Sequence, residues 1–67
     1  MEIYFNNQVM TIEESSTLSS FVALQVGENT KGLAVAINEF VVPKSDWDKT
    51  TLNQNDQVLI IKATQGG

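Results

Sequence analysis

The hydrophobic residues of this chain change their spacing twice, and this change is the strongest constraint on its fold. Residues 2–12 alternate apolar and polar side chains, which is typical of half-buried strands. Residues 18–26 place apolar side chains three and four positions apart, as one face of a helix requires. Residues 33–62 return to short apolar runs separated by turn residues. A hairpin, one helix and further strands predict an α+β fold with the helix across one face of a mixed sheet.

Turn residues divide the sheet into four to five strands. Asn6-Asn7, Asn38-Glu39 and Asn55-Asp56 each interrupt apolar runs, and Asn tolerates the positive φ values of tight turns. Pro43 ends the run before it, because proline has no N–H for a strand ladder. The expected strands are residues 2–5, 8–12, 33–37, 40–42 and 57–62. The crossover through the helix is long enough for parallel pairing, so we expect the first and last strands to lie side by side.

The helix has clear signals at both ends. Thr17 is the expected N-cap, because its hydroxyl can accept a hydrogen bond from a free N–H of the first turn. Leu18, Phe21 and Val22 form the apolar face, and Gly27 is the expected C-cap. The run from Ser15 to Thr17 also presents three hydroxyls, but capping explains it better than a nucleophile cluster does.

Residues 44–55 are polar and predict an irregular segment. Trp47 and Leu52 are its expected anchors in the core. Asp46, Asp48 and Glu39 lack the defined spacing of a carboxylate metal site, so we interpret them as solvated and expect no bound metal.

The last strand is apolar on both faces, although one helix covers only one face of a sheet. By the two-residue period, Val58 and Ile60 share one face, and we expect them to point inward. Leu59 and Ile61 then point outward and, with Phe40, predict an exposed docking surface. The alternative is that a further element buries both faces.

Length and composition exclude several functions. A chain of 67 residues forms one small domain, which we place at residues 1–62 with a flexible tail at 63–67. With no Cys and no His, it has no disulfide, thiolate or ordinary zinc site, and we expect no catalytic residue. A net charge of −4 argues against nucleic-acid and membrane partners. Glu2, Glu39 and Asp56 are expected to steer a basic partner, and the expected location is the cytoplasm.

The sequence ends in Gly66-Gly67. A terminal carboxylate is inert until its oxygen becomes a better leaving group, for example by adenylation, and this requires the tail to enter another protein's active site. Residues without a Cβ let the backbone pass through a narrow channel. We therefore expect Thr64, Gln65 and Gly66 to thread the tail and Gly67 to be the modified residue.

The chain resembles the ThiS family, the β-grasp, ubiquitin-like sulfur carriers of thiamine biosynthesis. The resemblance rests on Asn6, Thr17-Leu18, the run from Leu33 to Asn38, Val41-Val42-Pro43-Lys44 followed by Trp47, Asn55 to Val58, and Gly66-Gly67. It implies that a ThiF-like adenylyltransferase uses ATP with Mg to adenylate Gly67. Sulfur from a cysteine desulfurase route then gives a thiocarboxylate, which a ThiG-like thiazole synthase accepts. The chain would bind no cofactor itself and would not be an enzyme.

Three other functions remain open at this point. The small subunit of molybdopterin synthase uses the same chemistry for another product. A ubiquitin-like modifier would join Gly67 to lysines, and a β-grasp adaptor would bind partners without any reaction at its end.

Overall fold

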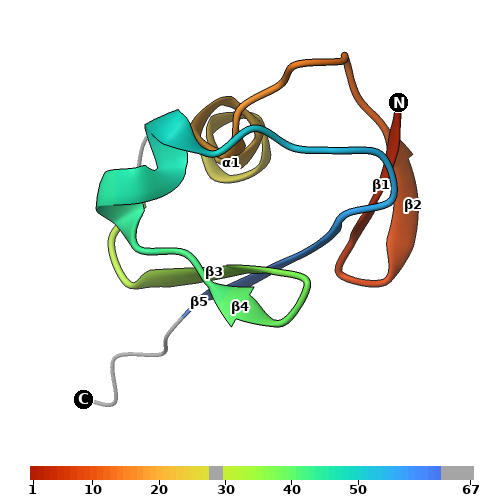
Figure 1. Ribbon diagram of the computed structural model, residues 1–67. Coiled ribbons are helices and arrows are strands. Elements are labelled where there is room, and N and C mark those ends of the chain that lie inside the picture. Colours follow the sequence, from red (N-terminus) through yellow and green to blue (C-terminus); the bar gives the residue numbers. More distant parts are fainter. Residues whose placement is uncertain (28–29, 63–67) are drawn as a thin grey trace.

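The computed structural model describes residues 1–27 and 30–62, and it confirms the predicted α+β arrangement (Figure 1). A mixed sheet packs against one α-helix, and a short 3₁₀ helix lies beside that helix. The elements, in chain order, are β1 (Glu2–Phe5), β2 (Gln8–Thr11), α1 (Leu18–Val26), β3 (Leu33–Ile37), β4 (Phe40–Val41), the 3₁₀ helix η1 (Lys44–Lys49) and β5 (Gln57–Lys62).

The strand order is β2-β1-β5-β3-β4, so the last strand lies at the centre of the sheet. β1 and β5 are parallel, as predicted, with Phe5 opposite Val58. β3 runs antiparallel to β5 along its whole length, from Ile37 opposite Val58 to Leu33 opposite Lys62. The central strand therefore has a partner on each side at its start.

Two-residue turns close both hairpins. Asn6 and Asn7 have φ values of 47° and 70°, and Asn38 and Glu39 have values of 51° and 74°. Positive φ at both central positions is the pattern of type I′ turns, whose twist matches that of the flanking strands. The predicted turns are confirmed, although Glu39 is a residue type that seldom adopts this backbone conformation.

Helix α1 begins and ends where the capping residues predict. The Thr17 hydroxyl accepts a hydrogen bond from the Ser20 amide at 3.1 Å, and Gly27 follows the last turn with a φ of 76°. The Leu18 amide also donates to the Thr50 carbonyl at 2.7 Å. This bond fixes the start of the helix to the segment that follows η1.

The core lies between α1, η1 and one face of the sheet. Phe5 and Phe21 meet edge to face, with ring centroids 5.2 Å apart. This arrangement favours aromatic pairs because of their quadrupoles. The expected inward positions on the helix, on β5 and at both anchors are confirmed. The buried side chains are Ile3, Leu18, Phe21, Val22, Val35, Trp47, Leu52 and Val58.

The prediction of an irregular segment over residues 44–55 was wrong in its first half. Residues Lys44–Lys49 form η1, which starts after Pro43 and buries Trp47. The indole N–H of Trp47 donates to the Val42 carbonyl at 2.9 Å. A single anchored turn needs only one apolar residue, so it leaves no periodic pattern in the sequence.

The strands on the β3 side are also less buried than expected. Of β3 only Val35 is fully buried, and β4 is limited to Phe40–Val41 at the edge of the sheet. The helix covers the middle of the sheet and leaves this edge open to solvent.

Candidate functional site

Strand β5 carries the candidate site, because it ends at Lys62, where the predicted reactive tail begins. The predicted tail at 63–67, with Thr64, Gln65, Gly66 and Gly67, lies outside the described residues. The structure therefore defines the platform from which this tail leaves.

The two faces of β5 differ as predicted. Val58 is 2% exposed, and Ile60 packs against the core. Leu59 is 42% exposed and Ile61 53%. The alternative in which a further element buries both faces does not hold within residues 1–27 and 30–62. The outward side chains of β5 are thus available for contact with another protein.

The register extends this open face across the sheet. Ala36 lies opposite both Leu59 and Val41, so Leu59, Ala36 and Val41 form one row. Tyr4 and Val9, opposite each other on β1 and β2, are also exposed. We use the name open face for the outward residues of the sheet, namely Tyr4, Val9, Ala34, Ala36, Val41, Leu59 and Ile61.

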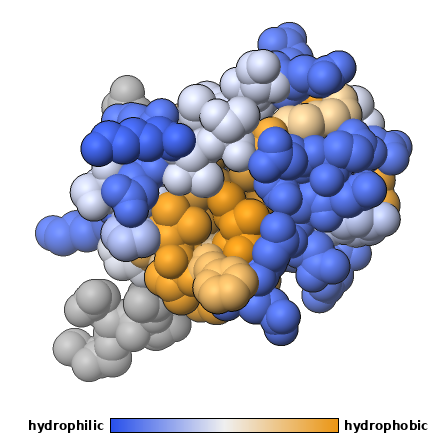
Figure 2. Space-filling view, viewed as in Figure 1, coloured by the Kyte–Doolittle hydropathy of each residue, from blue (hydrophilic) through white to orange (hydrophobic). Residues whose placement is uncertain are grey.

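Phe40 has a different place from the one predicted. It lies opposite Ile37, which in turn lies opposite Val58, so the register assigns it to the row that faces the core. Its side chain is nevertheless 77% exposed, because β4 lies at the edge of the sheet. Figure 2 shows hydrophobic side chains gathered over β4 and the adjoining strands, with polar side chains over most of the remaining view.

The start of β5 is fixed by a cluster of polar side chains that the sequence analysis did not identify. The amide of Asn38 donates to one oxygen of the Asp56 carboxylate at 3.0 Å, and its oxygen accepts from the Gln57 amide at 3.0 Å. The other Asp56 oxygen accepts from the Asn53 amide at 2.8 Å. Asp56 was expected to steer a partner, but its half-buried carboxylate closes the turn before β5. The two carboxylates Glu2 and Glu39 are exposed.

The hydroxyls before α1 have structural roles. Thr17 caps the helix, and the Ser16 hydroxyl donates to the Glu13 carbonyl at 2.6 Å. Within the described ranges, no three His, Cys, Asp or Glu side chains come together to hold a metal ion. These residues supply neither a nucleophile cluster nor a metal centre.

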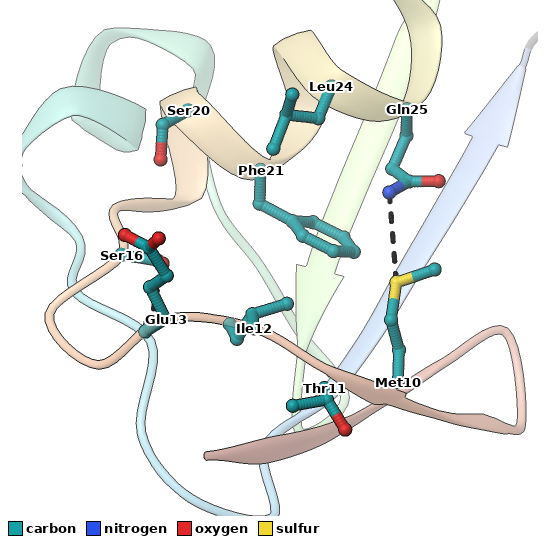
Figure 3. A pocket seen from close by; sticks show the side chains of 9 residues that line it. All are labelled: Met10, Thr11, Ile12, Glu13, Ser16, Ser20, Phe21, Leu24 and Gln25. Atoms are coloured by element: carbon teal, nitrogen blue, oxygen red, sulfur yellow. Dashed lines mark hydrogen bonds between the residues drawn. The ribbon is translucent and has the colours of Figure 1, made fainter.

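An open groove runs between β2 and α1, away from the open face (Figure 3). Ile12, Phe21 and Leu24 contribute apolar walls, and the Gln25 amide donates to the Met10 sulfur at 3.7 Å. Its polar groups are mainly hydroxyls, with the Glu13 carboxylate at one end. No helix in the described part of the chain is both long and apolar enough to cross a membrane.

Comparisons with known proteins agree with this geometry. The sequence matches the model of the ThiS family over residues 3–67. The sulfur carrier protein ThiS of Escherichia coli (strain K12) is 31% identical over 67 residues, which span 100% of both chains.

Two solved structures have the same fold. The crystal structure of the thiamine biosynthesis protein ThiS from Geobacter metallireducens superposes with a TM-score of 0.83 at 26% identity, covering 100% of both chains. An NMR solution structure of a thiamine biosynthesis protein from the same organism gives a TM-score of 0.80 at 22% identity, covering 100% of this chain and 88% of that one. The second likeness concerns the fold alone. Because the family model spans residues 3–67 and the Escherichia coli relative aligns over its full length, this chain belongs to the ThiS family.

Proposed function

We propose that this chain is a sulfur carrier of thiamine biosynthesis, with the sulfur held as a thiocarboxylate on Gly67. The observation that carries the proposal is the family match, which continues through the terminal Gly66-Gly67. The Escherichia coli relative has the name of a sulfur carrier. In this role the chain is a co-substrate, and the catalytic groups belong to its partners.

The proposed reaction has three steps. A ThiF-like adenylyltransferase transfers AMP from ATP, with Mg, to the Gly67 carboxylate and releases pyrophosphate. The terminal sulfur of a persulfide, supplied through a cysteine desulfurase, attacks the acyl carbon and displaces AMP. A second thiol then cleaves the resulting acyl disulfide and leaves the thiocarboxylate. The expected location is the cytoplasm, where ATP and reducing thiols are available.

The open face supplies the docking surface in this proposal. Leu59 and Ile61 point away from the core on the strand that leads to the tail, so a partner bound there also lies close to the tail. Phe40 and Val41 extend the apolar area at the sheet edge. The exposed carboxylates of Glu2 and Glu39 suit a partner with a basic rim, since complementary charge speeds association. A ThiG-like thiazole synthase would receive the sulfur at the same end.

The test is conversion to thiocarboxylate by the purified activating enzyme with Mg-ATP and a persulfide donor, measured by intact mass. We expect the wild-type chain to gain the mass of one sulfur in place of one oxygen. Deleting Gly67 should abolish this gain, and Gly66→Ala should reduce it strongly, because a Cβ restricts the backbone within a narrow channel.

Asp48→Asn is the matched control, since Asp48 is an exposed residue of η1 far along the chain from the tail. It should react like the wild type. Thiocarboxylate formation by the Gly67 deletion would contradict the proposal. Adducts of Gly67 with protein lysines would instead identify a modifier.

A further inference from the structure

The first hairpin turn is joined to the end of β5 by one side chain. The Asn6 amide N–H donates to the Val58 carbonyl at 3.0 Å, and the Asn6 side-chain oxygen accepts from the Ile60 N–H at 3.1 Å. Asn6 is thus bonded to β5 through both its backbone and its side chain, across 54 positions of sequence.

This pair of bonds has the geometry of a parallel ladder. In a regular parallel pair, one residue donates its N–H to one residue of the partner and accepts, through its carbonyl, from the N–H two residues further on. Asn6 makes the first bond with its backbone, but the chain turns away there with a φ of 47° to form the hairpin. The side-chain amide oxygen takes the place of the backbone carbonyl and completes the ladder.

The bond matters because β1 ends before β5 does. β1 stops at Phe5, and its register with β5 reaches only Val58. On the opposite side, β3 stays paired with β5 as far as Lys62. Among the described residues, Asn6 supplies the one hydrogen bond from the β1 side to β5 beyond Val58 that the geometry defines.

We propose that Asn6 is a positioning residue for the sulfur-transfer reaction. Ile60 lies between Leu59 and Ile61, which dock the partner, and it is two residues from Lys62, where the tail begins. By holding Ile60, Asn6 keeps the docking side chains and the root of the tail in one fixed relation. A docked carrier then presents its reactive end at a constant place. The proposal rests on the function proposed above.

Asparagine suits this position for two reasons. It adopts positive φ at a lower cost than most residues with a Cβ, and its amide oxygen has the hydrogen-bonding character of a peptide carbonyl. Glycine meets only the first requirement and aspartate meets both. Asn6→Gly therefore removes the acceptor without straining the turn, and Asn6→Asp retains it.

The test compares these variants with Asn7→Gly, which changes the other turn residue at a φ of 70°. Two quantities are measured on the whole chain. Amide hydrogen exchange at Ile60, relative to the core amide of Val22, reports the bond itself. Single-turnover conversion to thiocarboxylate, with the Kd for the activating enzyme, separates docking from presentation of the tail.

In Asn6→Gly we expect exchange at Ile60 to rise by about fivefold, as for the loss of one ordinary hydrogen bond, while Val22 is unchanged. The rate of conversion should fall severalfold with a Kd that changes by less than about twofold. Asn6→Asp should restore both values, and Asn7→Gly should resemble the wild type in both.

Two results would overturn the inference. Unchanged exchange at Ile60 would show that the bond does not hold β5. Raised exchange with an unchanged rate would limit Asn6 to the structure of the sheet. If the wild type itself forms no thiocarboxylate, the proposed function fails and the positioning role fails with it, whereas the exchange data still decide the bond.

Discussion

Neighbouring residues of β5 experience opposite environments, although they have similar side chains. Val58 is buried against the helix, whereas Leu59 lies on the open face with Tyr4 and Val41 nearby on the same side of the sheet. Both positions are branched and apolar, so composition alone does not distinguish them. The covered face stabilises the fold, and the open face leaves apolar area free on a small chain, which is typical of a binding surface.

The difference has a simple physical origin. A chain of this size has one main helix, and one helix covers one face of a five-stranded sheet. The second face stays open unless a partner covers it. In a carrier that must be recognised and then released, an open face of moderate area allows association without a permanent interface.

The largest expected effect comes from placing the same charge on each face. Val58→Asp should prevent folding, because an unpaired carboxylate in the core costs several kcal/mol, a large part of the stability of a small domain. Leu59→Asp should give a folded amide NMR spectrum, since its side chain reaches water. Two folded spectra, or two unfolded ones, would break the distinction between the faces.

Leu59→Asp should instead act on docking. We expect its affinity for the activating enzyme to fall by about tenfold or more, because the charge must be desolvated within an apolar contact. Isothermal titration of the folded variant measures this change, with Leu24→Asp as the control on the exposed side of α1. Equal losses for both variants would show that the contact does not depend on the open face.

A smaller effect is expected where the two regions meet, at Trp47. Its ring is buried on the covered side, while its indole N–H donates to Val42, the residue after β4. Trp47→Phe removes this bond and should lower the free energy of unfolding by about 1 to 2 kcal/mol in a urea titration. An unchanged denaturation midpoint would show that η1 does not support the sheet edge.

The smallest effect should be a gain in stability. Glu39 has a φ of 74°, a conformation that glycine adopts without strain. Glu39→Gly should raise the free energy of unfolding by about 0.5 kcal/mol, measured against Asn38→Gly. The Asn38 variant should instead be destabilised, since it loses the bonds to Asp56 and Gln57.

Most of the fold was predictable because its signals are local. Alternation along β5, the cap at Thr17 and the asparagine turns each depend on residues within a few positions of one another. The exposure of Leu59 and Ile61 followed from the same alternation, combined with the presence of one helix. The β1–β5 pairing required the further argument that the crossover through α1 is long.

The features that were missed depend on distant contacts. Asn6 and Asn38 look like ordinary turn residues in the sequence, but their side chains bond to β5, 54 and 19 positions away. Phe40 and Val41 could not be assigned to a face, because a two-residue strand shows no alternation. An asparagine at the first position of a tight turn is a signal for such side-chain bonds, since it offers an acceptor where the backbone leaves the sheet.

The central claim is that the reacting group of this chain is its terminal carboxyl group, presented by β5 beside an open face. The most direct test is the intact mass of the protein purified from its own cells during growth without thiamine, with fragmentation to locate any change. The account predicts replacement of one oxygen by sulfur at Gly67 in part of the population. An unmodified carboxylate under every growth condition, or Gly67 joined to lysines of other proteins, would contradict it.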